Sequence, residues 1–329
     1  MLILNAEDVR RALPMRDAIE AMKQAFAALS ANRTIVPARI HMDLDRNEGV
    51  SLFMPAYVDD DDPEQQALTI KAVSLFDHNQ SHGLARIQAA VLVLDPTTGC
   101  PIAMFEGATL TGIRTAAASG AATDLLARED SRKLAVFGAG VQARTHVEAV
   151  CAVRDIEEIA VYGPTLPKVE RLIEEMRCRV NGRLYAAASQ EDAARDADII
   201  CATTTSSTPI FEDVDVQPGT HINAVGSYKP VNREIPAETV IRSLVVVDSR
   251  EAAWEEAGDL IQPLEAGQIT RNHIHAELGE IVLGEKTGRS SSEQITFFKS
   301  VGIAVQDAFA AKAALANAKA SGIGQTVDW

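Results

Sequence analysis

A short glycine-rich segment marks a place where this chain could bind phosphate groups. The hydrophobic run 134–137 is followed by Gly138-Ala-Gly140-Val-Gln-Ala143, which has the spacing G-x-G-x-x-A. The first glycine permits a tight turn after a strand, the second lets backbone approach a pyrophosphate, and the alanine lets a helix pack closely on the strand. That helix would begin at Val141 and Gln142 and offer unpaired N–H groups to phosphate oxygens. The segment therefore predicts a dinucleotide site.

The residues after the next strand bear on which dinucleotide binds. NAD sites commonly place Asp or Glu at the end of this strand, where a carboxylate binds the ribose 2′-hydroxyl and repels a 2′-phosphate. Here the strand ends Tyr162-Gly163-Pro-Thr165, followed by Lys168, and there is no acid. Thr165 and Lys168 could meet a 2′-phosphate, although no arginine is present. The sequence favours NADP(H), with NAD(H) as the alternative.

Two further segments follow later strands and could line the nicotinamide half of the site. They are Thr203-Thr204-Thr205 and Val225-Gly226-Ser227. Ligands of open parallel sheets bind beyond the carboxyl ends of the strands, which makes Thr204, Val225, Gly226 and Ser227 candidates for cofactor binding. Ordinary strand-to-helix turns capped by hydroxyl groups would explain each of these residues equally well.

The alternation of elements around these motifs predicts the fold. Apolar strands are expected at 134–137, 158–162, 198–203, 221–225 and 244–248, with amphipathic helices between several of them. Such alternation is typical of a parallel sheet covered on both faces. Before it, a helix starting near Pro14 and strands at 51–54, 68–74 and 87–94 indicate a mixed, mostly sheet-forming unit.

A long helix is expected from Glu293 onward, carrying Phe297, Val301, Val305 and Phe309, and it would return to the first unit. The fold class is thus α/β: a Rossmann dinucleotide-binding domain over residues 116–302, and a discontinuous mixed α+β domain formed by residues 1–115 with 303–329.

Composition excludes several classes of function. The chain has 329 residues with 31 Lys plus Arg against 46 Asp plus Glu, a net charge of −15. Such a field repels nucleic acid and anionic lipid. No run approaches the roughly 18 apolar residues of a membrane span. The four cysteines are far apart, without the spacing of a zinc knuckle or a disulfide framework. We expect a cytoplasmic enzyme that binds neither nucleic acid nor membrane.

No metal site is expected. His78 and His82 are four residues apart and His273 and His275 two apart, but neither pair has a recognisable third ligand. Solvated or capping histidines explain both pairs.

Taken together, the motifs resemble the ornithine cyclodeaminase/μ-crystallin family over nearly the whole chain. Besides the glycine-rich segment, the resemblance rests on Pro37-Ala-Arg39, Met54-Pro55, Lys71-Ala-Val-Ser74, Leu110-Thr-Gly-Ile-Arg114-Thr-Ala-Ala, Asn223-Ala-Val-Gly226, Asp248-Ser-Arg-Glu, Glu256-Ala-Gly-Asp259 and Phe298-Lys-Ser-Val-Gly302. It implies a homodimer in which the first domain, with the C-terminal helix, pairs with its copy and holds substrate, while the other domain holds a nicotinamide cofactor. It also implies a reaction at the carbon–nitrogen bond of an α-amino or α-imino acid.

The resemblance also implies a substrate site. Arg39, Lys71 and Arg114 match the cations that hold the substrate carboxylate in the family, and Arg114 could also touch the cofactor. Arginine can grip a carboxylate with two parallel hydrogen bonds, and a partly buried lysine can exchange a proton near neutrality. Lys71 and Arg114 are therefore the catalytic candidates. Met54 and Tyr228 are expected to contact the substrate, and Ser300 is expected near the cofactor.

One departure from the family separates the possible reactions. Cyclodeaminases have an aspartate soon after the segment that is Val225-Gly226 here, but this chain has Tyr228 at that place and no carboxylate before Glu234. This favours NAD(P)H-dependent reduction of a cyclic 2-imino carboxylate, such as Δ1-pyrroline-2-carboxylate, to the L-amino acid. Alternatives are ornithine cyclodeamination, reductive amination as in alanine dehydrogenase, and a non-catalytic NADPH-binding protein resembling crystallin.

Overall fold

The computed structural model describes residues 1–63 and 65–329, which divide into two units. The first comprises residues 1–114 and 303–329, two separate stretches of the chain, and the second comprises residues 115–302. Within the described part of the chain, none of the helices combines the length and the apolar content that crossing a bilayer requires.

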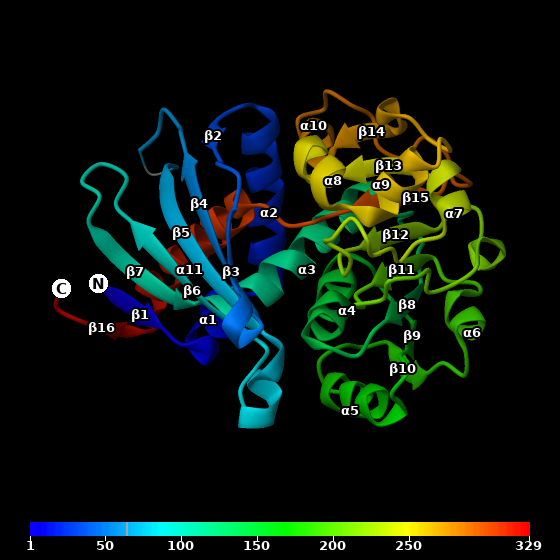
Figure 1. The fold of residues 1–329 in the computed structure, drawn as a ribbon, viewed down its shortest axis with the longest axis horizontal. Helices are drawn as coiled ribbons and strands as arrows, with labels where there is room; N and C mark the ends of the chain where they lie inside the picture. The colour runs from blue at the N-terminus through cyan, green and yellow to red at the C-terminus, as the bar shows by residue number, and fades with distance from the viewer. Residues whose placement is uncertain (64) are drawn as a thin grey trace. The chain divides into compact units, whose positions relative to one another are not determined.

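A mixed sheet forms the body of the first unit (Figure 1). Its strand order is β16-β1-β7-β6-β5-β4-β2, and β3 also pairs with β4. The strands are β1 (Leu2–Leu4), β2 (Thr34–Ile35), β3 (Ile40–Leu44), β4 (Gly49–Val58), β5 (Ala67–Phe76), β6 (Ile87–Leu94), β7 (Pro101–Glu106) and β16 (Gln325–Thr326). Antiparallel pairing from β4 to β7 fixes the register in which Met54 lies opposite Lys71, and Lys71 opposite Val91.

Helices cover one face of this sheet. They are α1 (Ala6–Ala12), α2 (Met15–Ser30) and α11 (Ala304–Ser321). The last of these packs against β4, β5 and β6 and against the two others. Side chains alternate along the strands, so Met54, Val73 and Val91 are buried on the covered face. Among the described residues, the opposite face carries exposed apolar side chains, Ile40 and Met42 among them.

The second unit is built on a parallel sheet with the strand order β10-β9-β8-β11-β12-β15-β13-β14 (Figure 1). Its strands are β8 (Lys133–Phe137), β9 (Glu158–Tyr162), β10 (Arg183–Ala186), β11 (Ile199–Ala202), β12 (His221–Ala224), β13 (Leu244–Val247), β14 (Ile274–Glu277) and β15 (Thr296–Lys299). Every pairing in this sheet is parallel. Numbered in chain order from β8, the first five strands match the first five places of the Rossmann arrangement 3-2-1-4-5-6, and β15, the last strand of the unit in the chain, takes the sixth place. The predicted Rossmann fold is confirmed.

The helices of this unit follow its strands. They are α4 (Val141–Val153), α5 (Leu166–Met176), α6 (Gln190–Ala194), α7 (Ala237–Ile241), α8 (Arg250–Glu256), α9 (Gly258–Glu265) and α10 (Leu278–Val282). A further helix, α3 (Gly107–Leu126), runs through the chain boundary between the two units. Short 3-10 turns occupy Asp45–Asn47, Asp77–His82, Asp213–Asp215 and Arg271–His273.

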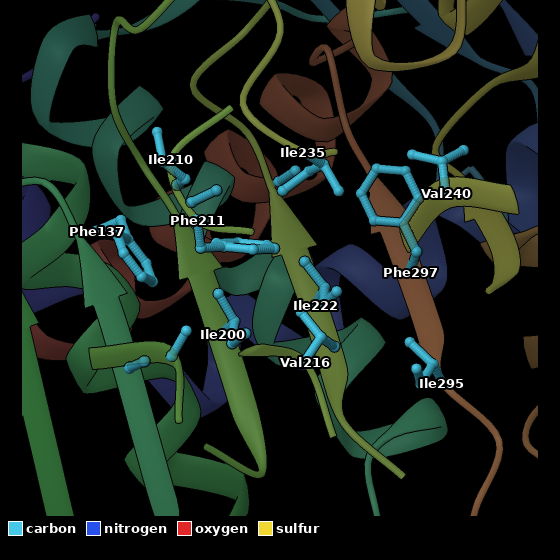
Figure 2. Close-up of a cluster of buried hydrophobic side chains, with 14 of the residues drawn as sticks. Phe137, Ile200, Ile210, Phe211, Val216, Ile222, Ile235, Val240, Ile295 and Phe297 are labelled. Atoms are coloured by element: carbon cyan, nitrogen blue, oxygen red, sulfur yellow. The ribbon is translucent and has the colours of Figure 1, made fainter. Parts of the chain in front are cut away.

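Both faces of the parallel sheet are apolar, as parallel strands require. Alternate residues of β8 and β11 enter two different buried clusters: Phe137 and Ile200 lie in one, Val136 and Cys201 in the other. Figure 2 shows the first cluster, in which Phe297 of β15 packs with side chains from the neighbouring strands and loops.

The long helix predicted from Glu293 is wrong in its first half. Residues Thr296–Lys299 form the buried strand β15, paired on both sides, and α11 begins only at Ala304. Between them Gly302 has a φ of 82°, which a helix cannot continue through. A short run that is buried at every position fits a strand and a helix equally well, and sheet pairing decided between them.

Candidate functional site

The glycine-rich turn connects β8 to α4, and its two glycines meet different needs. Gly138 has a φ of +112°, and a Cβ atom there would lie 2.7 Å from Thr203 Oγ1 and 2.9 Å from the Thr203 carbonyl oxygen. A Cβ on Gly140 would meet no described atom within 4 Å. The first glycine is required by the protein itself. The second leaves open space in which another molecule can approach the backbone.

The side chain of Arg144 stabilises this turn by hydrogen bonds to its backbone. Its Nη1 donates to the carbonyl oxygens of Ala139 (2.8 Å) and Gly140 (3.0 Å), and its Nε contacts Glu175 Oε2 of α5 at 2.5 Å. The Gly138 N–H donates to the Tyr162 carbonyl oxygen at 2.8 Å, so within this turn the N–H groups of Ala139 and Gly140 are the candidates to face a ligand. Arg144 was not singled out from the sequence, although its place one helical turn after Gly140 is a usable signal.

A cleft of about 510 Å³ opens at the carboxyl ends of β8, β9 and β11. It is lined by Phe137, Gly138, Ala139, Gly140, Tyr162, Gly163, Pro164, Thr165, Lys168, Gln190, Thr203, Thr204, Thr205, Ser206 and Ile210. The predicted cofactor residues Gly138, Gly140, Thr165, Lys168 and Thr204 are thus brought together. Gln190 and Ile210 were missed, since nothing in their local sequence marks them. The cleft lies at the switch point of the strand order, where dinucleotides bind in this fold.

Among the described residues that line the cleft, Lys168 is the only charged one. Thr165 is the N-cap residue of α5, and its side chain makes no capping bond. Beside the end of β9 the lining therefore has a cation and a hydroxyl and no carboxylate. A 2′-phosphate would meet no repulsion from these lining residues.

Other predicted cofactor residues lie outside this lining. Val141 is 65% exposed at the start of α4, and the Gln142 side-chain oxygen is buried without a hydrogen-bond partner among the described residues. Ser300 is buried, and its hydroxyl donates to Asp248 Oδ2 at 2.7 Å. Asp248 also accepts the N–H groups of Val301 and Gly302, so it fixes the turn after β15.

Glu234 joins the ends of β11 and β12. Its Oε1 accepts bonds from the Thr204 N–H and hydroxyl, both at 2.7 Å, and its Oε2 accepts from the N–H groups of Gly226 (2.9 Å) and Ser227 (3.0 Å). Burial raises the pKa of Glu234, although the nearby Lys299 acts against this. Both oxygens of Glu234 therefore accept hydrogen bonds from backbone N–H groups. The predicted cofactor residues Thr204, Gly226 and Ser227 are positioned by one carboxylate that the sequence did not reveal in this role.

A second buried pair supports the same segment. Lys299 Nζ lies 2.8 Å from Asp259 Oδ2 and donates to the Ser227 carbonyl oxygen at 2.5 Å. Asp259 Oδ1 accepts the N–H groups of Glu234 and Ile235. These contacts give Asp259 a structural role. Val225 leads into the same segment, and Tyr228, half-buried, follows it.

In the first unit, two of the predicted substrate cations lie around one carboxylate. Asp307 Oδ2 is 2.6 Å from Lys71 Nζ, and Asp307 Oδ1 accepts from Arg114 Nε at 3.0 Å. The three residues are 1%, 2% and 5% exposed, in that order. Gln306 Oε1 accepts from Arg114 Nη1 at 2.8 Å. Lys71 comes from β5, Arg114 from α3, and the carboxylate and amide from α11.

Asp307 was missed in the sequence, although a signal exists. It stands among alanines and other apolar residues in a helix with 11 buried positions. Charged residues are seldom fully buried unless they are paired, so an acid in such a helix indicates a buried partner. Two of the predicted cations, Lys71 and Arg114, therefore lie around the carboxylate of Asp307.

The charges in this cluster set the acidity of Lys71. Burial lowers its pKa, Asp307 raises it, and Arg114 and Arg39 lower it further, which leaves the pKa at about 8. Burial alone would raise the pKa of Asp307, but the Arg114 and Lys71 charges and their hydrogen bonds outweigh it and hold the pKa below its ordinary value. At neutral pH the cluster therefore contains an ionised carboxylate and an ammonium that can exchange its proton.

The other expected substrate residues of this unit lie close to Lys71 in the fold. Met54 is buried directly opposite Lys71 in the β4–β5 register. Arg39 is half-buried just before β3, and its charge acts on Lys71.

No group of three or more His, Cys, Asp or Glu side chains among the described residues is arranged to hold a metal ion. His273 and His275 contact backbone carbonyl oxygens, and His78 contacts Glu48.

The chain is similar to known proteins over nearly its whole length. The sequence model of the ornithine cyclodeaminase/mu-crystallin family matches residues 1–322. A Δ1-pyrroline-2-carboxylate reductase of Bacillus cereus (strain ATCC 10987 / NRS 248) is 39% identical, over 100% of both chains. The structure of Thermococcus litoralis Δ1-pyrroline-2-carboxylate reductase in complex with NADH and L-proline is 41% identical, with a TM-score of 0.94, over 99% of this chain and 100% of that one. An archaeal alanine dehydrogenase dimer with bound NAD is 30% identical, with a TM-score of 0.91, over 100% of this chain and 99% of that one. This chain belongs to the ornithine cyclodeaminase/mu-crystallin family.

Proposed function

We propose that this protein is an NAD(P)H-dependent oxidoreductase that reduces the C=N bond of a cyclic 2-imino carboxylate, such as Δ1-pyrroline-2-carboxylate, to the L-amino acid. The observation that carries the proposal is Lys71, a buried lysine with a pKa of about 8 beside Arg114. It combines a carboxylate-binding charge with a proton that can be donated near neutrality. The names of the bacterial and archaeal reductase relatives support this choice of substrate.

The cleft at the glycine-rich turn is the proposed cofactor site. It fits a dinucleotide because the backbone at Gly140 borders open space and the N-terminus of α4 follows it. The contacts proposed for the cofactor are Gly138, Gly140, Val141, Gln142, Thr165, Lys168, Thr204, Val225, Gly226, Ser227 and Ser300, with Arg114 as a further contact. The bound cofactor supplies hydride; the protein supplies binding, orientation and electrostatics.

Arg39, Lys71 and Arg114 bind the substrate carboxylate, and Met54 and Tyr228 contact the rest of the substrate. Hydride addition at the imine carbon leaves a pair of electrons on nitrogen, and Lys71 gives this nitrogen a proton. The C=N bond becomes CH–NH, Lys71 becomes a neutral amine, and solvent returns the proton. Lys71 and Arg114 are thus the proposed catalytic residues.

We further propose that NADP(H) is preferred over NAD(H). Lys168 and Thr165 beside the end of β9 favour a 2′-phosphate, and no acid stands among the described lining residues to repel it. The structures of the two relatives hold NADH and NAD, and the ratio of kcat/KM with NADPH and NADH tests the preference of this chain.

The protein is proposed to be a homodimer in the cytoplasm. One face of the first unit's sheet exposes Ile35 (60%), Ile40 (58%), Met42 (48%) and Ile70 (37%), an apolar surface suited to a second copy. The dimer of the archaeal alanine dehydrogenase relative supports this assembly. All four cysteines are free thiols, as is usual in a reducing compartment.

The test is oxidation of NADPH and NADH in the presence of three substrates: Δ1-pyrroline-2-carboxylate, Δ1-piperideine-2-carboxylate, and pyruvate with ammonia. We expect stoichiometric cofactor consumption and an L-amino acid product with at least one cyclic imine. Lys71→Met should retain dinucleotide binding and lose turnover. Activity with pyruvate and ammonia alone would instead indicate an amino-acid dehydrogenase.

A further inference from the structure

Three buried charged side chains lie together at the covered face of the first unit's sheet, and their net charge is positive. Lys71, Arg114 and Asp307 bring two positive charges and one negative charge into a site from which water is largely excluded. An unpaired buried charge is costly, so the single carboxylate stabilises the two cations in this buried position. The remaining positive charge is available to an anionic ligand.

Asp307 divides its two oxygens between the two cations. Oδ2 faces the Lys71 ammonium at 2.6 Å, and Oδ1 accepts from Arg114 Nε at 3.0 Å. The adjacent Gln306 accepts from Arg114 Nη1 and from the Ile303 N–H, so its own position is fixed at the start of α11. The helix thereby sets the direction of the guanidinium and the place of the ammonium together.

The charge balance on Lys71 shows why this carboxylate matters. Three charged groups act on Lys71: Asp307 from α11, Arg114 from α3, and Arg39 from the segment before β3. Burial and both arginines favour the neutral amine, and Asp307 alone opposes them among the described residues. Asp307 itself is ionised near neutrality and cannot be the proton donor.

We propose that Asp307 is the positioning residue of the substrate site, which keeps the Lys71 ammonium charged for donation to the imine nitrogen and holds Arg114 in place for the substrate carboxylate. This rests on the proposed reductase function. It assigns to α11 a role in the chemistry beyond packing against the sheet.

The sign of the pH effect follows from the donor role. Reduction needs protonated Lys71. The rate of reduction is therefore highest below the Lys71 pKa and falls as the pH rises through about 8. Oxidation of L-proline needs the neutral amine, so its rate rises over the same interval. Replacing Asp307 removes the charge that raises the Lys71 pKa, and both transitions should then move to lower pH.

The experiment compares pH profiles of kcat in the wild type, Asp307→Asn and Asp307→Glu. We expect the upper limb of Asp307→Asn to move down by about one pH unit or more, which is about a fivefold or greater loss of reduction rate at pH 8. Asp307→Glu should return the limb toward the wild-type position. The control is Glu106→Gln, which removes a carboxylate that caps α3 through the N–H groups of Ala108 and Thr109. It should lower the melting temperature without moving the limb.

A measurement that does not depend on turnover can test this proposal separately from the reductase function. The ionisation of Lys71 is followed by NMR of ¹³Cε-lysine, with the signal assigned from its loss in Lys71→Met. A midpoint near 8 in the wild type that falls in Asp307→Asn supports the proposal even if no cyclic imine is reduced. If Asp307→Asn does not fold, the wild-type midpoint and the Asp307→Glu profile decide. A wild-type midpoint of about 10 or above, or an unmoved limb in folded Asp307→Asn, would overturn it.

Discussion

Arg39 differs from the two cations next to it in the proposed site because it is only half-buried. Its charge acts on Lys71, yet the fold of the first unit does not enclose it as it encloses Lys71 and Arg114. A substitution at Arg39 is therefore the cleanest way to remove one carboxylate contact without opening the core. A matching substitution at Arg114 would also leave Asp307 with one partner fewer.

We expect Arg39→Ala to raise the substrate KM by about ten- to a hundredfold, because a charged hydrogen bond is worth about 1.5–3 kcal/mol. The dissociation constant for NADPH, measured by fluorescence titration, should stay within about twofold. Arg46→Ala, at an exposed arginine of the same unit, serves as control. An unchanged KM would remove Arg39 from the proposed substrate site.

Glu234 matters for the alternative lyase reaction. Cyclodeamination needs a carboxylate to assist attack of the terminal amine, and Glu234 is the first one after Tyr228 in the sequence. Its two oxygens already accept four hydrogen bonds from the chain. A phenol at Tyr228 is a poor general base near neutrality.

We therefore expect ornithine with a catalytic amount of NAD to yield little or no proline, measured by amino-acid chromatography. Tyr228→Phe should alter imine reduction only moderately, because the proposed carboxylate contacts remain. Ammonia release from ornithine without net NADH accumulation would contradict the reductase assignment.

At the scale of elements, the connection between β8 and α4 depends on a residue outside the glycine motif. Arg144 fixes two carbonyl groups of the turn and is itself held by Glu175 of α5. We expect Arg144→Ala to raise the dissociation constant of the dinucleotide about tenfold, because the turn loses a charged hydrogen-bond donor to two peptide groups. Calorimetric titration measures this directly.

A second Arg–Glu pair provides the control. Arg179 Nη1 lies 3.1 Å from Glu148 Oε1 of α4 and touches no part of the turn in the described contacts. Arg179→Ala should leave dinucleotide affinity unchanged. Equal losses in both variants would mean that Arg144 acts only through the packing of the helices.

The turn after β9 should decide cofactor preference. Gly163→Asp places a carboxylate where it can accept from a ribose 2′-hydroxyl and repel a 2′-phosphate, and it should shift the ratio of kcat/KM toward NADH. A Cβ at Gly163 would lie 3.3 Å from Val169 Cγ2, so Gly163→Ala is needed as the control for crowding. A wild type that already prefers NADH by about tenfold would contradict the NADP(H) proposal.

The strands and turns could be predicted from the sequence where the signals in the local sequence were strong. The strand at Glu158–Tyr162 has the expected bounds, and the glycine motif sits on the expected turn. The strand at Thr296–Lys299 was taken for helix because its burial on both faces leaves no periodicity to read. Asp307 was not recognised as a site residue because its partners Lys71 and Arg114 lie 236 and 193 residues away. Glu234 was not recognised because it links Thr204, 30 residues away, to Gly226 and Ser227, and this link exists only in the fold.

At the scale of the whole molecule, the exposed sheet face is the feature that bears on assembly. Ile40 and Met42 of β3 project from the face that no described helix covers in the first unit. We expect Ile40→Lys combined with Met42→Glu to convert a dimer to monomers, measured by light scattering after size-exclusion chromatography, because buried charges would oppose the contact. Val214→Lys, at an exposed apolar residue of the second unit, should leave the mass unchanged. A monomeric wild type would contradict the proposed dimer.

The order of the units along the chain has a consequence for synthesis. Lys71 and Arg114 leave the ribosome before the whole second unit, and Asp307 leaves after it. Until then the two cations have no carboxylate partner among the described contacts of the first unit, and closing the core around them would bury unpaired charge. The second unit is continuous and needs no later segment for its own sheet. The unit that begins first during translation should therefore mature last, when α11 arrives and supplies the carboxylate.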